Sequence, residues 1–396
     1  MLSNKYIELE EKLGAHNYHP LDVVIKKGKG CWVWDVEGNK YLDCLAAYSA
    51  VNQGHCHPKI YKAFIKQAKK LTLTSRAFRN DKLPLLYEKL HKLTGYDKFL
   101  PMNSGAEAVE TAIKTARKWG YKVKGIEPNK AEIIVASGNF HGRTTTIISF
   151  SDDPSSYENY GPYTPGFQIA KYGNLEDFKF KVNNNTVAIL VEPIQGEGGV
   201  IIPPKGFLKG LEVICKENNI LLIVDEIQSG LGRSGKLFAY EYEDVKPDMV
   251  IIGKALGGGF YPVSGVLGTN ETLGVFEPGT HGSTFGGNPL AAAVAMAALD
   301  VIIDENLVER SFELGEYLLK KLKKIKSDKI KEIRGKGLWI GLELNEPARP
   351  YVIKLKEKGI LVKDTHETII RIAPPLTAKK KHLNMLAKKI KDVLMD

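Results

Sequence analysis

The sequence predicts an α/β fold, in which a large domain with a mainly parallel central sheet is joined to a smaller α+β domain. Two observations predict it. Short runs of apolar, mostly β-branched residues recur through the centre of the chain, at Ile133–Ala136, Val187–Val191, Leu221–Val224 and Met249–Ile252. Because these runs are apolar throughout rather than alternating, both faces of each strand should be covered, which is typical of parallel sheets. After Gly286 the pattern changes to long helices followed by a few short strands.

The N-terminal segment is expected to contain a β-hairpin. The runs Cys31–Val36 and Lys40–Leu45 flank the turn residues Gly38 and Asn39, and glycine and asparagine favour the tight turns that join hairpin strands. Pro58 then begins a helix, because apolar residues follow it at helical spacing and proline is favoured in the first turn.

The remaining elements divide the chain into parts. Helical segments such as Leu208–Glu217 lie between the central strands. The C-terminal part is expected to contain helices at about Asn288–Asp304 and Glu309–Lys324, strands near Leu338–Glu343, Ile360–Val362 and Ile369–Ile372, and a basic helix from Thr377. We therefore predict a large domain over residues 46–285, a small domain over residues 286–396, and an N-terminal segment, residues 1–45, that packs with the small domain or at a dimer interface.

The composition is that of a globular protein. Hydrophobic residues make up 43% of the 396 residues and charged residues 26%, which does not suit a disordered chain. The net charge of +10 raises the alternative of a basic, non-catalytic protein that binds nucleic acid. The lysines, however, are spread along the chain and concentrate in its C-terminal third without interleaved aromatic residues, which is more typical of solvated helix faces. We expect no nucleic-acid partner.

Three further features indicate a cytoplasmic protein. The four cysteines form no CxxC pair, as expected of reduced thiols inside a cell. No apolar run approaches the roughly 20 residues that a membrane span needs. The N-terminal segment carries Glu8, Glu10 and Glu11, which is unlike a signal peptide.

Two charged residues stand directly after apolar strands, where ligands bind in open α/β sheets. Asp225 follows Leu221–Val224, and a carboxylate there can keep a heteroaromatic nitrogen protonated. Lys254 follows Met249–Ile252 and precedes a glycine-rich stretch, which suits a lysine that forms a covalent bond to a carbonyl cofactor. Alone, Asp225 also fits a helix cap or a metal ligand, and Lys254 an exposed loop. Because they end neighbouring strands, the two residues together are expected to lie on opposite sides of one cofactor ring.

A helix start provides a candidate phosphate site. Ser104-Gly105-Ala106-Glu107 opens a helix, and Ser104 with Glu107 fits a capping box. The free N–H groups and positive dipole end of a glycine-containing helix start also suit a phosphate. The two interpretations are compatible.

Several other residues follow the predicted strands. Phe140 can lie flat on a ring, and Arg143 can bind a carboxylate in bidentate fashion. Glu192 follows the strand Val187–Val191, and Arg371 lies inside an apolar strand, where it needs an anionic partner. Each also fits packing or a structural ion pair. The triplet His55-Cys56-His57 lacks metal-ligand spacing, so we expect no metal site.

In this order the motifs resemble those of the fold-type I enzymes that use pyridoxal phosphate (PLP), and specifically the subgroup III aminotransferases. The resemblance covers nearly the whole chain and is carried by Asn103-Ser104-Gly105-Ala106-Glu107-Ala108, Glu192-Pro193, Asp225-Glu226 and Gly253-Lys254-Ala255. Within that family the stretches Gly14–Pro20, Tyr48–His55 and Leu73–Phe78 are most similar to the ornithine-specific members.

The resemblance implies a role for each cofactor residue. Lys254 would bind PLP covalently and move the reacting proton, while Asp225 pairs with the pyridinium nitrogen. Gln228 would contact the ring hydroxyl, and Phe140 would stack on the ring. Ser104, Gly105 and Ala106 would bind the phosphate, and Glu192 belongs to the same cofactor site. Thr284 would reach the phosphate of the partner subunit, so that a homodimer with active sites at its interface is implied.

The resemblance also implies the reaction. The terminal (δ) amino group of L-ornithine would pass to 2-oxoglutarate in a ping-pong cycle, giving glutamate and glutamate 5-semialdehyde, which cyclises to pyrroline-5-carboxylate and links arginine catabolism to proline biosynthesis. Glu197 would cover Arg371 while ornithine is bound and move away when Arg371 takes the α-carboxylate of glutamate. Arg143 and Tyr18 would hold the distal carboxylate, and Tyr48 would shape the ornithine pocket.

One residue departs from the pattern. His141 stands where tryptophan is common in ornithine-specific members, and the sequence Phe140-His141-Gly142-Arg143 is also common in acetylornithine aminotransferases. Transamination of acetylornithine or 4-aminobutyrate therefore remains an alternative, although the stretches that contain Tyr18 and Tyr48 favour ornithine.

Overall fold

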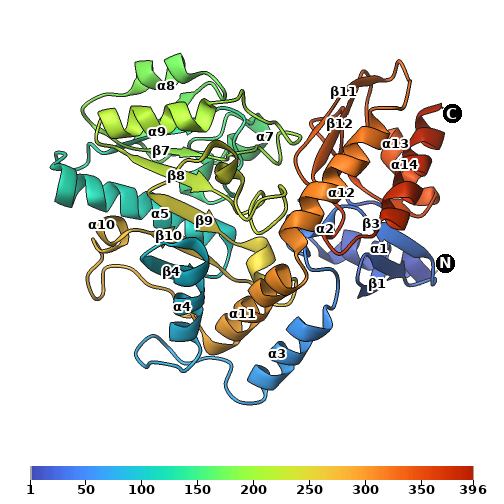
Figure 1. Ribbon diagram of the computed structural model, residues 1–396, viewed down its shortest axis with the longest axis horizontal. Coiled ribbons are helices and arrows are strands. Elements are labelled where there is room, and N and C mark those ends of the chain that lie inside the picture. Colours follow the sequence, from blue (N-terminus) through green and yellow to red (C-terminus); the bar gives the residue numbers. More distant parts are fainter. Residues whose placement is uncertain (1, 396) are drawn as a thin grey trace.

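The computed structural model describes residues 2–395 and is built around a seven-stranded sheet (Figure 1). The strand order is β4-β10-β9-β8-β7-β5-β6, and all neighbours are parallel except those of β10. The strands are β4 (Lys98–Met102), β5 (Glu132–Ala136), β6 (Phe167–Ala170), β7 (Thr186–Val191), β8 (Leu221–Asp225), β9 (Met249–Ile252) and β10 (Ser264–Gly268). The predicted α/β fold with a mainly parallel central sheet is confirmed, as are the four apolar strands.

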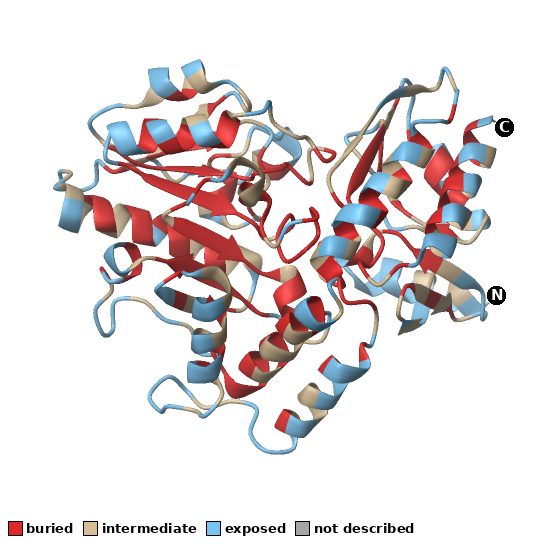
Figure 2. Ribbon diagram, in the orientation of Figure 1, coloured by how far each residue is buried: buried red, intermediate tan, exposed pale blue. Residues whose placement is uncertain are grey.

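Helices cover both faces of this sheet. Along β8, Leu221 and Ile223 point into a core shared with α5 (Gly105–Trp119), while Leu222 and Val224 point into a core shared with α9 (Phe207–Glu217). Such alternation between two apolar cores explains why these strands are apolar at every position. Figure 2 shows the sheet as a buried layer between partly exposed helices.

Three long helices lie beside the sheet on the side of β4 and the segment that follows β9. They are α3 (Pro58–Ala68), α4 (Leu83–Thr94) and α11 (Pro289–Asp304). Helix α11 packs against α3, α4 and the turn η3 (Lys254–Gly257), so this element of the predicted small domain lies beside the large sheet, with the helices that border it (Figure 1). The boundary at residue 286 stays a prediction.

A second, four-stranded antiparallel sheet forms the small domain. Its order is β11-β12-β15-β14, with strands β11 (Ile330–Gly335), β12 (Ile340–Leu344), β14 (Lys363–Thr365) and β15 (Ile369–Ile372). It packs with α12 (Leu307–Leu322), α13 (Arg349–Glu357) and α14 (Lys380–Met395). The basic C-terminal helix begins three residues later than predicted.

The N-terminal segment lies against the small domain. The predicted hairpin is present as β2 (Trp32–Asp35) and β3 (Lys40–Asp43), and β1 (Ile25–Lys29) extends it. Strand β13 (Ile360–Leu361) pairs with β3 in parallel, so a strand expected in the C-terminal part completes the N-terminal sheet. The helix α1 (Leu2–Leu13) was not predicted, because none of its residues is buried and its apolar pattern is therefore weak.

The remaining elements are short. They are α2 (Ala46–Ser49), η1 (Gly120–Lys124), α6 (Thr145–Ile148), α7 (Pro154–Tyr157), α8 (Leu175–Lys181), η2 (Ala239–Glu243) and α10 (Asn270–Leu273). Within residues 2–395, no helix has both the length and the apolar character needed to cross a membrane.

Candidate active site

The carboxyl ends of β8 and β9 bring the two residues predicted to act on the cofactor to one edge of the sheet. Asp225 ends β8 in register with Ile251 of β9, and Lys254 follows β9 by two residues. Ile227 packs against both Gly253 and Gly105. A Cβ added to Gly253 would lie 3.6 Å from the Ile227 side chain, and one added to Gly105 would lie 3.0 Å from it. The start of α5 therefore meets the same edge of the sheet.

Lys254 has an unusual environment. Its backbone φ is +44°, in the left-handed region that is costly for a side chain larger than glycine. Burial, and to a smaller extent the positive charge of Arg371, lower the pKa of Lys254 to about 8, although the nearby carboxylates of Glu197, Asp225 and Glu192 act in the opposite direction. A lysine amine with such a pKa can lose its proton near neutral pH and act as a nucleophile or base.

Asp225 is held by groups that the sequence did not assign to it. His141 Nδ1 lies 2.7 Å from one carboxylate oxygen, and the backbone N–H of Ile227 donates to the other at 3.0 Å. Burial alone lowers the pKa of His141, but the hydrogen bond and charge of Asp225 raise it above the ordinary value. From the sequence, His141 was identified only as a departure from the family pattern. Its position directly after Phe140 was the signal that could have placed it in the site.

The start of α5 has the predicted capping box. The Ser104 hydroxyl accepts from the backbone N–H of Glu107 at 3.2 Å, and Glu107 accepts from the backbone N–H of Ser104 at 2.7 Å. Gly142 lies close to Ala106: a Cβ added to Gly142 would be 3.0 Å from the Cβ of Ala106. The helix start is thus flanked by the loop that carries Phe140 and Arg143.

Glu192 connects two loops of the site. It is buried, and its two oxygens accept from the backbone N–H groups of Phe140 at 3.0 Å and Gly196 at 3.3 Å. Burial raises the pKa of Glu192 to about 7. The carboxylate thereby positions the loop of Phe140 and the loop of Glu197, while its predicted contact with the cofactor stays a prediction.

Arg371 on β15 is buried beside the anionic partner that the sequence required. Its Nη1 donates to Glu197 at 3.0 Å and its Nη2 to Gln228 at 2.7 Å. Gln228 also approaches Glu197, with its Nε2 donating at 3.4 Å. The predicted pair of Glu197 and Arg371 is thus present, with Gln228 joined to it rather than separate from it.

Aromatic rings border this pair. The guanidinium carbon of Arg371 lies 5.3 Å from the ring centre of Tyr48 and 5.5 Å from that of Trp339. The amine of Lys254 lies 6.0 Å from the Tyr48 ring. Tyr48 and Tyr18 line one cavity of about 710 Å³ between the N-terminal segment and the small domain. No sequence signal pointed to Trp339.

Three other predicted site residues are exposed. Arg143 is exposed, with its guanidinium 5.8 Å from the Phe140 ring centre, and Tyr18 is 78% exposed. Thr284 is also exposed. Their contacts to substrate or partner stay predictions.

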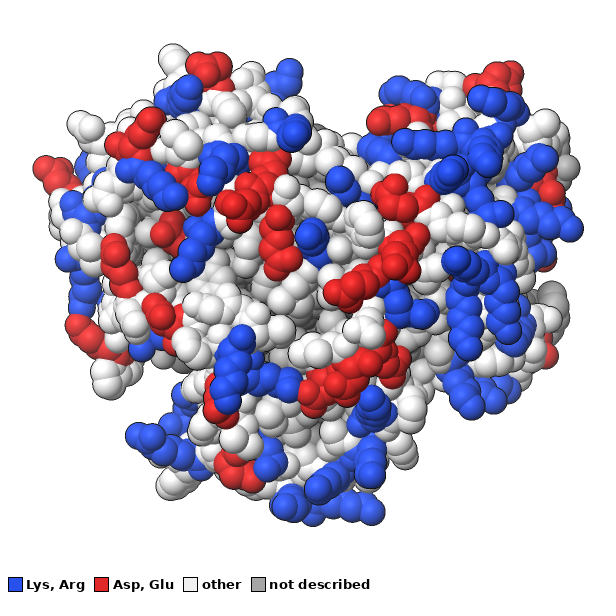
Figure 3. Space-filling model, viewed as in Figure 1, with Lys and Arg blue, Asp and Glu red and all other residues white. Residues whose placement is uncertain are grey.

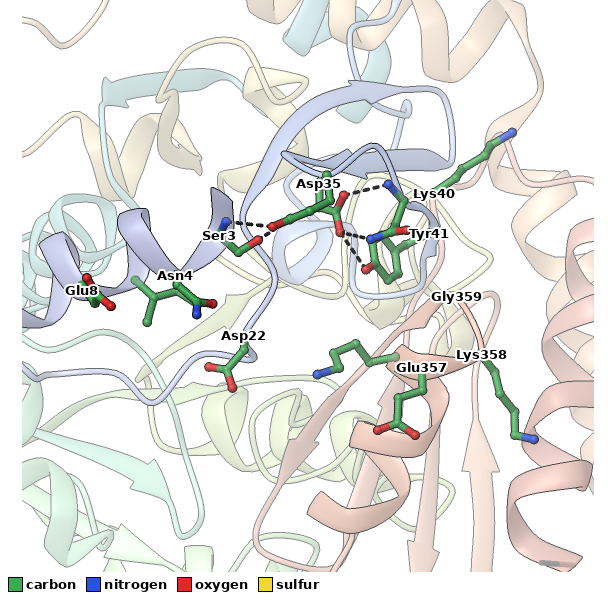
Figure 4. Close-up of a pocket in the computed structure, with 14 residues that line it drawn as sticks. Ser3, Asn4, Glu8, Asp22, Asp35, Lys40, Tyr41, Glu357, Lys358 and Gly359 are labelled. Carbon is green, nitrogen blue, oxygen red and sulfur yellow. Dashed lines mark hydrogen bonds between the residues drawn. The ribbon is translucent and has the colours of Figure 1, made fainter. Parts of the chain in front are cut away.

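A larger cavity of about 940 Å³ contains none of the predicted site residues. Figure 4 shows its charged lining, drawn from α1, the N-terminal strands and the end of α13. There Asp35 already accepts hydrogen bonds from Asn39 and Tyr41, and Glu37 from Ser3. The chemistry therefore belongs to the edge of the central sheet.

The side chains at that edge fit PLP, the cofactor that the motifs imply. A part-buried lysine with a lowered pKa provides a covalent attachment point, and a buried carboxylate backed by a histidine suits a pyridine nitrogen. The helix start of Gly105 and Ala106 suits a phosphate. Among residues 2–395, no group of three or more metal-binding side chains gathers here or elsewhere.

Comparison with known proteins finds one family over nearly the whole chain. The family model described as aminotransferase class-III matches residues 13–394. The chain is 59% identical over 392 residues to the ornithine aminotransferase of Brevibacillus brevis, covering 99% of this chain and 98% of that protein. It is 60% identical over 388 residues to that of Halalkalibacterium halodurans, covering 98% of each.

Two solved structures extend the comparison. The ornithine aminotransferase from Toxoplasma gondii ME49 superposes with a TM-score of 0.98 at 43% identity, covering 99% of this chain and 95% of that one. An acetylornithine aminotransferase from Elizabethkingia anophelis superposes with a TM-score of 0.92 at 55% identity, covering 99% of both chains.

Proposed function

We propose that this chain, which belongs to the class-III aminotransferase family, is a PLP-dependent ornithine aminotransferase. It would transfer the δ-amino group of L-ornithine to 2-oxoglutarate. The observation that carries the substrate assignment is the buried Arg371, which is covered by the carboxylate of Glu197 rather than left open. The full-length similarity to relatives named ornithine aminotransferase supports it.

The cofactor, when bound, withdraws electrons from the carbon that carries the transferred amino group. Lys254 would hold it covalently and move the proton at that carbon through Nζ, for which a pKa near 8 is suitable. Asp225, steadied by His141, would keep the pyridine nitrogen protonated. Ser104, Gly105 and Ala106 would bind the phosphate, Phe140 would cover the ring, and Gln228 and Glu192 would complete the site.

The pair of Glu197 and Arg371 accounts for two different substrates in one site. Ornithine presents a terminal amine with no carboxylate beside it, so Glu197 would stay on Arg371 and neutralise it. Glutamate and 2-oxoglutarate carry a carboxylate next to the reacting carbon. Glu197 would then move away, and Arg371 would bind that carboxylate in bidentate fashion. Arg143 and Tyr18 would hold the distal carboxylate, and Tyr48 would border the ornithine chain.

We further propose that the enzyme works as a homodimer in the cytoplasm. The exposed Thr284 would reach the phosphate bound by the partner subunit. The semialdehyde product would cyclise to pyrroline-5-carboxylate, which places the reaction between arginine catabolism and proline biosynthesis.

The visible absorption spectrum of the purified protein tests this function. The protein supplied with PLP should be yellow, lose that colour when ornithine is added, and produce pyrroline-5-carboxylate; 2-oxoglutarate should restore the colour. A protein that stays colourless with PLP would contradict the PLP assignment. A yellow protein that ignores ornithine would contradict the substrate alone.

Acetylornithine is the second candidate substrate. It is favoured by the Elizabethkingia structure, which is 55% identical, and by His141. The same spectra taken with acetylornithine and with 4-aminobutyrate separate the three candidates. The amino donor that the enzyme uses should bleach the cofactor at a lower concentration than the other two.

A further inference from the structure

Trp339 lies against both segments that carry the ion pair proposed to select between the substrates. It is fully buried immediately before β12, and its ring centre lies 5.5 Å from the guanidinium carbon of Arg371. A Cβ added to Gly196 would lie 2.7 Å from Cζ2 of Trp339, so the indole packs directly against the residue before Glu197. One side chain thus supports both halves of the pair.

The backbone around this contact is closely packed. A Cβ on Gly341 of β12 would lie 2.4 Å from the carbonyl oxygen of Gly199, so the loop from Gly196 to Gly199 rests on the beginning of β12. Gly341 is also the β-sheet partner of Arg371. The loop that carries Glu197 and the strand that carries Arg371 are therefore both packed against β12, directly beside Trp339.

Trp339 contacts Arg371 through its ring face and not through its indole N–H. Its Nε1 is buried without a hydrogen-bond partner in the described part of the chain. An unpaired buried donor is costly, and phenylalanine in the same place would avoid that cost. An aromatic face beside a desolvated guanidinium, in contrast, stabilises the charge.

We propose that Trp339 is a positioning residue for the α-carboxylate of glutamate and 2-oxoglutarate. This inference rests on the proposed function. While Glu197 is in place, Arg371 is held by Glu197 and Gln228. Once Glu197 moves away, the Gln228 bond and the faces of Tyr48 and Trp339 remain to hold the guanidinium. The ring therefore matters most in the half-reaction with the α-carboxylate substrate.

The test compares Trp339→Leu, which removes the ring, with Trp339→Phe, which keeps one. Each half-reaction is followed separately in the holoenzyme, and binding of glutarate, a dicarboxylate that cannot react, is measured by calorimetry. For the leucine variant we expect the KM for 2-oxoglutarate and the Kd for glutarate to rise about five- to thirtyfold, the range of a desolvated cation–π contact. The ornithine half-reaction should change less than about twofold, and the phenylalanine variant should stay close to wild type.

Trp32→Leu is the matched control. The Lys40 ammonium lies 4.2 Å from the Trp32 ring, so this change also removes an indole next to a cation, but outside the site. It should leave the ratio of the two half-reactions unchanged. If Trp339→Leu does not fold, Trp339→Met provides the same comparison without a ring.

The outcomes separate the two proposals. If wild-type enzyme does not transaminate ornithine, the proposed function is wrong. If the wild type does so but Trp339→Leu leaves glutarate binding unchanged, or slows both half-reactions equally, the role of Trp339 is wrong. A phenylalanine variant as impaired as the leucine variant would show that the N–H is used instead, and would also overturn the inference.

Discussion

At the scale of single residues, the site depends on charges that are buried but partnered. Lys254 combines a left-handed backbone with a pKa lowered to about 8, and each is costly for an ordinary lysine. Such local strain persists where the surrounding structure holds it, here at the first residue of the turn η3, two residues after β9. Arg371 and Asp225 are buried in the same small region, each with a hydrogen-bonded partner.

Glu197→Gln should change which substrate the enzyme prefers. Glutamine has nearly the same shape but no charge, so Arg371 would no longer be neutralised when ornithine is bound. We expect the ratio of kcat/KM for ornithine to that for glutamate to fall about tenfold, equivalent to about 1.4 kcal/mol. Single-turnover absorbance measurements of each half-reaction give this ratio. An unchanged ratio would contradict the proposed movement of Glu197.

His141→Asn should destabilise the protein more at low pH than at high pH. The folded-state pKa of His141 is raised, so its contribution is fully present below the unfolded pKa of about 6.5 and is lost as the pH rises through the folded pKa. Every tenfold gain in the proton affinity of His141 on folding contributes about 1.4 kcal/mol. Urea unfolding of both proteins at about pH 6 and about pH 9 gives the difference. A pH-independent difference would mean that His141 stays neutral beside Asp225.

At the scale of secondary structure, the start of α5 serves both stability and ligand binding. Ser104→Ala removes the capping hydroxyl and should lower the free energy of unfolding by about 1 kcal/mol. It should also weaken PLP binding, because the same helix start is the proposed phosphate site. Asn174→Ala removes the N-cap of α8 as a control. The control should lose similar stability in urea unfolding while its PLP affinity, measured by titration, stays unchanged.

Elements with strong local signals were predicted, and those without them were not. The strands β5, β7, β8 and β9 are apolar on both faces because each separates two cores, so their sequences were unambiguous. Strand β14 and helix α1 carry few buried side chains. They form because neighbouring segments supply their hydrogen bonds or contacts, which a local pattern does not record.

At the scale of the whole molecule, one buried arginine links its parts. Arg233, in the loop after β8, donates to Asn52 of the N-terminal part and to the carbonyls of Leu338 and Pro374 in the small domain. Burial, and to a smaller extent the positive charge of Arg371, lower the pKa of Arg233 to about 9. These bonds hold the small domain, with Arg371, in place against the sheet edge.

Arg233→Met should therefore destabilise the entire molecule. Three buried acceptors would lose their donor, and we expect a loss of about 3–5 kcal/mol in the free energy of unfolding. Arg310→Met, which removes one donor to the carbonyl of Ala378 at the part-buried face of α12, should cost about 1 kcal/mol. Thermal denaturation of both variants compares them; equal midpoints would contradict the linking role of Arg233.

Charge is distributed unevenly over the whole molecule. Figure 3 shows Lys and Arg side chains gathered over the small domain, on the right. Acidic side chains are more frequent near the centre of the molecule in this view. Helix α14 contributes five lysines and one aspartate, a net charge of +4, whereas the acidic and basic residues of α12 balance. The solvated face of α14 thus carries part of the net charge of +10.

The sequence alone was enough to predict the α/β class, four of the seven central strands, and the positions of Lys254 and Asp225 at the ends of two of them, because buried strands and strand-end residues leave local patterns. Only the tertiary structure decided that His141 supports Asp225, that Gln228 joins Glu197 on Arg371, and that Trp339 lies beneath this pair. It also placed β13 beside β3. These contacts join residues on separate elements of the fold, and local periodicity contains no information about which distant segments meet.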